Sequence, residues 1–97
     1  MQGEDAGPAG RVAKMRHGNP WGLPESEAAL MDAMCEHGRI QAAADAIGAT
    51  LAAARARLRQ ARIRMAGHKP YARNIVAVQP VPTVIACLQW HKWRTAP

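Results

Sequence analysis

The sequence has no phenylalanine, one tyrosine and three tryptophans, so that only 4% of its 97 residues are aromatic. A core in this chain must therefore be filled mainly by aliphatic side chains, and 97 residues suffice for a single small domain. No apolar run reaches about 18 residues, the length that crosses a bilayer. The sequence predicts one domain and no membrane-spanning segment.

Cysteine is scarce, with only Cys35 and Cys87, and the sequence begins with no pattern typical of a secretory signal. Both cysteines stand in apolar runs, which favours reduced core thiols in a cytoplasmic protein. A zinc site with His37 and His91 is disfavoured, because Cys35 and His37 are two positions apart on a predicted helix. With no phosphate-binding glycine loop and no nucleophile with a spaced base, we expect no enzyme activity, metal or cofactor.

Acidic residues are missing from residues 50–65, a stretch that holds five arginines. The whole chain has 13 lysines and arginines against seven acids, a net charge of +6. Eight of the basic residues lie between Arg39 and Arg73, where the one acid is Asp45. A localised positive surface favours a polyanionic partner, since binding releases counterions from phosphates.

Residues 40–65 have the pattern of a short helix over 40–47, a sharp turn and a long helix over 50–65. Gly48 can adopt the positive φ that such a turn needs, and Thr50 can cap the second helix. Small and apolar residues recur at helical spacing, namely Ala43, Ala44 and Ile47 in the first helix and Ala54, Leu58, Ala61 and Met65 in the second. These residues predict a buried face on each helix.

Further helices are predicted on both sides of this pair. Pro24 can start a helix that ends at about Glu36 before Gly38, with Ala28, Leu30, Met31 and Met34 as its apolar stripe. Thr83 can cap a last helix over 84–94, in which Val84, Cys87 and Leu88 share one side, flanked by Ile85 and Trp90. The fold class is therefore all-α, a bundle of three helices plus a C-terminal helix, with a short strand or wing as an alternative near 75–78.

Residues 1–19 contain four glycines and almost no large apolar side chain, which predicts a flexible arm ahead of a domain over 20–97. Arg11, Lys14 and Arg16 make its second half basic. Such an arm can follow a phosphate backbone or enter a minor groove, and a merely solubilising tail is the alternative.

Residues 23–67 resemble a known family in three segments: Leu23, Glu27, Leu30, Met31 and Met34; Ala43-Ala44 with Ile47-Gly48; and Arg57-Leu58 with Ala61, Met65 and Gly67. They are similar to the helix-turn-helix domain of LuxR-type (GerE-type) transcription regulators, and equally to the promoter-reading C-terminal domain of sigma factors. Residues 83–90 look like the family's fourth helix, displaced by an insertion around 71–82. Small phage and prophage proteins often carry this arrangement with a tryptophan-rich C-terminus.

The resemblance implies that Thr50, Leu51, Ala52, Ala53, Arg55 and Ala56 face the bases. In that set the stretch 51–54 departs from the family, because it offers no hydrogen-bonding side chain. Arg55 can pair with a guanine edge, and a good bidentate contact contributes roughly 1–3 kcal/mol of discrimination. We expect phosphate contacts from Arg39, Gln41, Arg57, Arg59 and Arg62, together with the arm residues Arg11, Lys14 and Arg16.

Two functional hypotheses follow. The first is a DNA-binding transcriptional regulator of phage or prophage type, a homodimer that places helix 50–65 in the major groove of double-stranded DNA in the cytoplasm of a bacterial or phage-infected cell. The second is a factor that binds RNA polymerase, such as an antitermination or sigma-like polymerase-redirecting protein. Trp90 and Trp93 are either a lid on the core or a surface for a partner protein. A non-specific DNA-coating protein is a third alternative.

Overall fold

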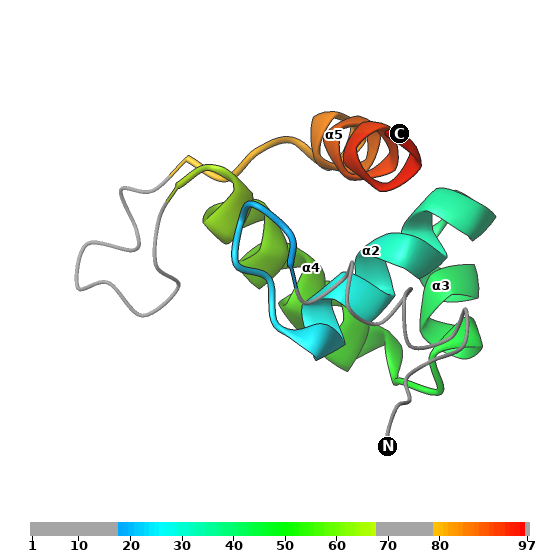
Figure 1. The fold of residues 1–97 in the computed structure, drawn as a ribbon. Coiled ribbons are helices and arrows are strands. Elements are labelled where there is room, and N and C mark those ends of the chain that lie inside the picture. Colours follow the sequence, from blue (N-terminus) through cyan, green and yellow to red (C-terminus); the bar gives the residue numbers. More distant parts are fainter. Residues whose placement is uncertain (1–17, 68–78, 97) are drawn as a thin grey trace, which may run out of the picture.

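The computed structural model describes residues 18–67 and 79–96, and within these ranges the chain forms four α-helices and no strand (Figure 1). The helices are α2 (Glu25–His37), α3 (Ile40–Ala46), α4 (Leu51–Met65) and α5 (Thr83–Thr95). The predicted all-α bundle is confirmed. The predicted strand or wing at 75–78, and all of the predicted arm before residue 18, lie outside the described residues.

Two glycines with positive φ separate the first three helices. Gly38 ends α2 with φ 75°, and its N–H donates to the Met34 carbonyl at 2.8 Å. Gly48 stands between α3 and α4 with φ 69°. Thr50 caps α4, since its Oγ1 accepts a hydrogen bond from the Ala53 N–H at 3.1 Å. The predicted helix ends and the predicted cap are confirmed here.

The start of α5 differs from the prediction. Thr83 is the first residue of the helix, and the cap position belongs to Pro82, which makes no side-chain hydrogen bond there. Proline has a fixed φ that suits the entry to a helix, and this helix begins without a capping hydroxyl. Thr83 as the cap of α5 is therefore a wrong prediction.

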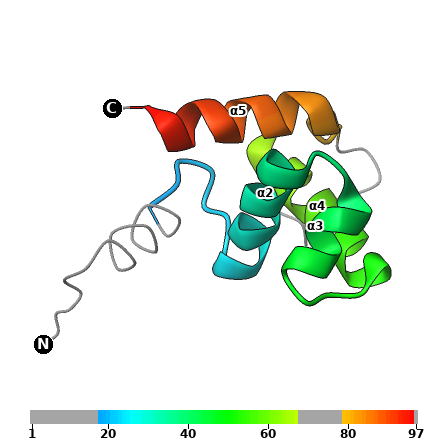
Figure 2. The same ribbon diagram turned by 90° about the vertical axis from the view of Figure 1, so that its right-hand side faces the viewer.

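The core lies where α2 packs against α3, α4 and α5, as Figures 1 and 2 show from two sides. Half of its residues are alanines, whose small side chains let the helices approach closely. Its members are Leu23, Ala28, Leu30, Met31, Ala33, Met34, Ala43, Ala44, Ala54, Leu58, Ala61, Met65, Ala86 and Trp90. The predicted buried faces of α2, α3 and α4 are confirmed by this set.

The buried side of α5 is not the predicted one. Ala86 and Trp90, one turn apart, are both 0% exposed, whereas Val84 is 70% exposed and Leu88 60%. The small side chain of Ala86 lets the backbone of α5 approach α2, and the indole of Trp90 fills the space between these two helices. Trp90 is therefore a core residue. Of its two predicted places, the one in the core is confirmed and the one on a partner surface is wrong.

Three tryptophans join α5 to the segment before α2. The ring centroid of Trp21 lies 5.8 Å from that of Trp90 and 6.0 Å from that of Trp93. Asn19 fixes this segment, because its Oδ1 accepts the Leu23 N–H at 2.9 Å and its Nδ2 donates to the Leu23 carbonyl at 3.0 Å. Asn19 is itself buried, so the predicted arm boundary after residue 19 falls too late.

Candidate nucleic-acid interface

The five arginines of α4 fall into two groups. Arg55 and Arg59 are exposed and Arg57 is half-buried. Among residues 18–67 and 79–96, none of these three guanidinium groups makes a hydrogen bond or ion pair. Within the described residues, no acid competes with an outside ligand for these charges.

Arg62 and Arg64, nearer the end of α4, bind within the protein. Arg62 Nε donates to the Val81 carbonyl at 2.7 Å, and the Val81 N–H donates to the Arg62 carbonyl at 3.1 Å. Arg64 Nε donates to Glu27 Oε1 at 3.0 Å. The Nε of Arg62 is engaged, so this predicted phosphate ligand serves first to hold the segment before α5 against α4.

The last turn of α4 is covered on the side that faces away from the core. Ile63 is two positions from both Ala61 and Met65, so it points away from the face that these residues bury, yet it is only 1% exposed. The accessible part of this face therefore ends before residue 63. It comprises the part of α4 before residue 63, which carries Arg55 and Arg59.

The predicted base-contacting residues gather at the beginning of α4. Thr50, Ala52, Arg55 and Ala56 are exposed there, and Leu51 is half-buried. The Thr50 oxygen already accepts the capping hydrogen bond from the Ala53 N–H. The exposed side chains at this end of the helix are thus methyl groups, one hydroxyl and the Arg55 guanidinium, which can approach a flat or grooved surface closely.

The predicted phosphate ligands ahead of α4 differ in whether their side chains already make a hydrogen bond within the chain. Arg39 is exposed at the start of α3, and its guanidinium makes no hydrogen bond or ion pair within the described ranges. Gln41 is also exposed, but its Nε2 donates to Asp45 Oδ1 at 3.2 Å. The carboxylate of Asp45 therefore lies beside the amide that was predicted to bind a phosphate. Arg11, Lys14 and Arg16 lie outside the described residues.

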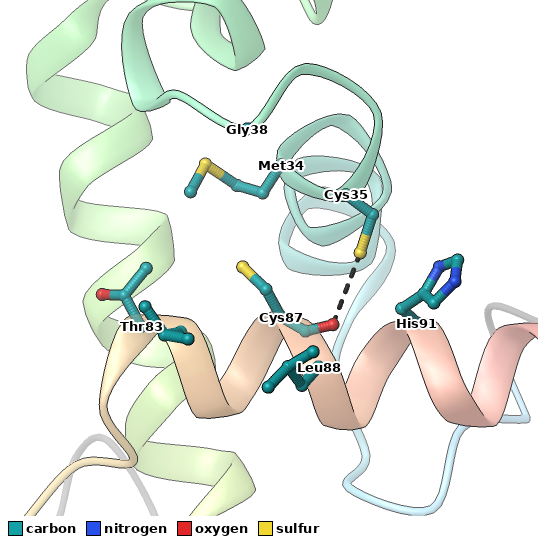
Figure 3. Close-up of a pocket in the computed structure, with 8 residues that line it drawn as sticks. Met34, Cys35, Gly38, Thr83, Cys87, Leu88 and His91 are labelled. Carbon is teal, nitrogen blue, oxygen red and sulfur yellow. Dashed lines mark hydrogen bonds between the residues drawn. The ribbon is translucent and has the colours of Figure 1, made fainter.

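A groove of about 360 Å³ lies on another part of the molecule, between the end of α2 and α5 (Figure 3). Met34, Cys35 and Cys87 line it, and Cys35 Sγ lies 3.6 Å from the Cys87 carbonyl oxygen. Burial raises the pKa of both thiols above the ordinary 9.0. They are neutral, half-buried thiols.

The described residues contain neither a group that could hold a metal ion nor a helix that could cross a membrane. Among those that the structure describes, no three His, Cys, Asp or Glu side chains form a group that could hold a metal ion. Of the described helices, none combines the length and the apolar composition needed to cross a bilayer.

Two carboxylates bind partners across the fold that the sequence does not indicate. Glu27 is buried against Arg64, and Asp32 accepts hydrogen bonds from Trp90 and Arg94. Glu27 stands directly before Ala28 in the apolar stripe, which is the one local signal of its burial. The partners of both acids are distant in sequence, so spacing does not reveal them.

Comparisons of the chain with protein-family models, curated proteins and solved structures find no match.

Proposed function

We propose that this chain is a transcriptional regulator that binds double-stranded DNA and places the first half of α4 in the major groove. The observation that carries the proposal is the pair Arg55 and Arg59, which are exposed on the accessible side of α4 and have no acidic partner among the described residues. Their helix follows the Gly48 turn. In a helix-turn-helix protein the second helix enters the groove with its N-terminal residues against the bases. The protein would act in the cytoplasm of a bacterial or phage-infected cell.

The side chains divide this work by their chemistry. Arg55, nearer the start of the helix, suits a bidentate contact with guanine, while the methyl groups of Ala52 and Ala56 suit thymine methyl groups. Arg59, one turn later, and Arg39 at α3 suit phosphates. One strong base contact per chain gives roughly 1–3 kcal/mol of discrimination, which makes the sequence preference of a single chain modest.

The test begins with duplexes selected from a random pool at physiological salt, whose affinity is then measured by fluorescence anisotropy. Arg55→Lys is the charge-matched control for Arg55→Ala: lysine keeps the phosphate attraction but loses the bidentate fork. We expect both variants to lose about 1–3 kcal/mol of discrimination at one guanine. Arg59→Ala is expected to weaken all duplexes alike and to reduce the slope of log K against log salt by about 1, whereas Arg59→Lys keeps that slope.

The double variant Arg55→Ala/Arg59→Ala decides the proposal. It should lose most of its duplex affinity at moderate salt, while its circular dichroism spectrum stays that of the parent because both side chains are exposed. Unchanged duplex binding by this folded variant would refute the proposal. If the parent protein bound all duplexes with equal affinity and its binding still weakened with salt, it would instead be a non-specific coating protein.

A factor that binds RNA polymerase is the second candidate. It is favoured by the first turn of α4, where residues 51–54 are Leu-Ala-Ala-Ala and give no hydrogen-bonding side chain for a base edge. Capture of polymerase subunits by the purified chain after nuclease treatment would support this function. Loss of the complex on nuclease treatment would leave DNA as the link.

A further inference from the structure

The exposed residues of α4 share one face of the helix. They are Ala52, Arg55, Ala56 and Arg59. Each residue of an α-helix turns by about 100°, so these four positions lie within a sector of about 100° around the axis. Ala52 stands three positions before Arg55 and four before Ala56, spacings that place Cβ atoms about 5–6 Å apart. The guanidinium of Arg55 therefore rises from a surface of alanine methyl groups.

The alanines limit what this face can distinguish in a base pair. Alanine has no donor or acceptor, so Ala52 and Ala56 discriminate only through apolar contact. The one apolar group on the major-groove edges of the bases is the C5-methyl group of thymine. 5-Methylcytosine carries the same methyl group on the same ring carbon. An alanine methyl is also short, and the run of alanines at 52–54 lets the backbone of this first turn come close to the bases.

Arg55 and the alanines together fit one particular base step. A guanidinium paired with O6 and N7 of guanine lies in the plane of that base. The C5 carbon of a pyrimidine on the 5′ side of the guanine adjoins the same edge, one step of about 3.4 Å away. A methyl group on that carbon meets the flat, weakly hydrated face of the guanidinium and the alanine surface beside it.

We infer that this face reads a C5-methylated pyrimidine followed on the same strand by guanine, and that methylation of a cosine-free thymine equivalent, namely 5-methylcytosine in place of cytosine, raises the affinity of the chain for its site. The inference rests on the proposed function. It deepens that function by naming the base step and by making DNA methylation a regulator of the same site.

Binding of the parent chain to duplexes that differ by one methyl group tests the inference. The guanine at which Arg55→Ala loses discrimination fixes the register, and thymine, uracil, 5-methylcytosine or cytosine is placed on its 5′ side. By fluorescence anisotropy at physiological salt, thymine over uracil and 5-methylcytosine over cytosine should each give about fourfold tighter binding, the effect of burying one methyl group. The same exchanges on the 3′ side of the guanine are the matched control and should leave the affinity unchanged.

The double variant Ala52→Gly/Ala56→Gly tests the alanine surface. It removes two methyl groups from the protein and keeps Arg55, so the guanine preference should remain while both methyl preferences fall toward 1. Ala46→Gly, at an exposed position of α3, is the control and should keep them. Circular dichroism compares the helix content of the variants, and the measurement on the parent chain stands without them.

The results separate this inference from the proposed function. If the parent chain needed Arg55 and Arg59 for binding but bound each methylated duplex no more tightly than its unmethylated counterpart, the inference would be overturned and the proposed function would stand. Methyl preferences that survived in the folded glycine variant would overturn the role of the two alanines. A chain that bound none of the duplexes would remove the proposed function, and the inference with it.

Discussion

The indole Nε1 of Trp90 donates a 2.8 Å hydrogen bond to Oδ1 of Asp32, and Arg94 Nη1 donates to the same oxygen at 3.0 Å. The two donors are one turn apart on α5, and the acceptor is on α2. One carboxylate therefore fixes both the depth and the rotation of α5 against the other helices.

Removal of this carboxylate is expected to destabilise the fold. Asp32→Ala leaves the indole N–H of a fully buried tryptophan without this acceptor, and we expect a loss of about 2 kcal/mol in the free energy of unfolding. Asp32→Asn keeps an oxygen for Trp90 and should lose less. Urea unfolding followed by tryptophan fluorescence measures both; a loss below about 0.5 kcal/mol for Asp32→Ala would show that the contact contributes little.

Gly48→Ala tests the turn between α3 and α4. The glycine has φ 69°, and a Cβ added there would meet no atom within 4 Å, so the cost is that of the backbone conformation alone. We expect about 1–2 kcal/mol of destabilisation for alanine. Asparagine tolerates this conformation better and should cost less. Thermal unfolding of the two variants gives the order, and an alanine variant as stable as the parent would be inconsistent with the observed φ.

Glu27 makes stability depend on pH in a direction opposite to that of most salt-bridged acids. Burial raises the pKa of this carboxyl above its ordinary 4.5, and Arg64 offsets only part of the shift. Its contribution is fully present below pH 4.5 and is lost as the pH rises through the folded-state pKa, because the native state then holds the proton more tightly than the unfolded chain.

The matched variant Glu27→Gln lacks this titration. The stability of the parent minus that of Glu27→Gln should therefore fall as the pH rises above 4.5, and then become constant. Urea unfolding of both proteins at several pH values measures the difference. If the difference increased with pH, the ion pair with Arg64 would outweigh the burial of the charge.

The two thiols should react slowly. Burial raises the pKa of Cys35 and Cys87, so less thiolate is present at pH 8 than in an unfolded chain. Alkylation by iodoacetamide, followed by mass spectrometry, should be slower in the native protein than in urea. By the same linkage, the thiols contribute stability that is lost as the pH rises above 9.0. Native and unfolded chains that alkylate equally fast at pH 8 would contradict the burial of the thiols.

The sequence predicts α2, α3 and α4 well because glycines mark their ends and one apolar stripe marks each buried face. It also predicts the extent of α5 but not its buried side, because the first turns hold Val84, Ile85, Ala86, Cys87 and Leu88 in succession, so that apolar residues occur on every side and the period gives no direction. The sequence also does not predict the acidic partners of Arg64 and Trp90, which are Glu27 and Asp32. They are separated by 37 and 58 positions, and such pairs depend on how helices meet in space.

Of the predicted interface, the exposed position of Arg55 and Arg59 follows from helical spacing, and the structure agrees with it. The sequence does not predict the hydrogen bond from Arg62 Nε to the Val81 carbonyl, because that bond depends on where the chain returns after α4. The sequence alone does not distinguish an arginine that holds the fold together from one that is free to bind a phosphate.

The paired hydrogen bonds between Arg62 and Val81 tie the last turn of α4 to the segment before α5. One of these bonds uses the guanidinium of Arg62, and the other uses only its backbone carbonyl. A substitution at position 62 therefore removes the first bond and can leave the second in place, so that the link between the two helices is partly independent of side-chain identity.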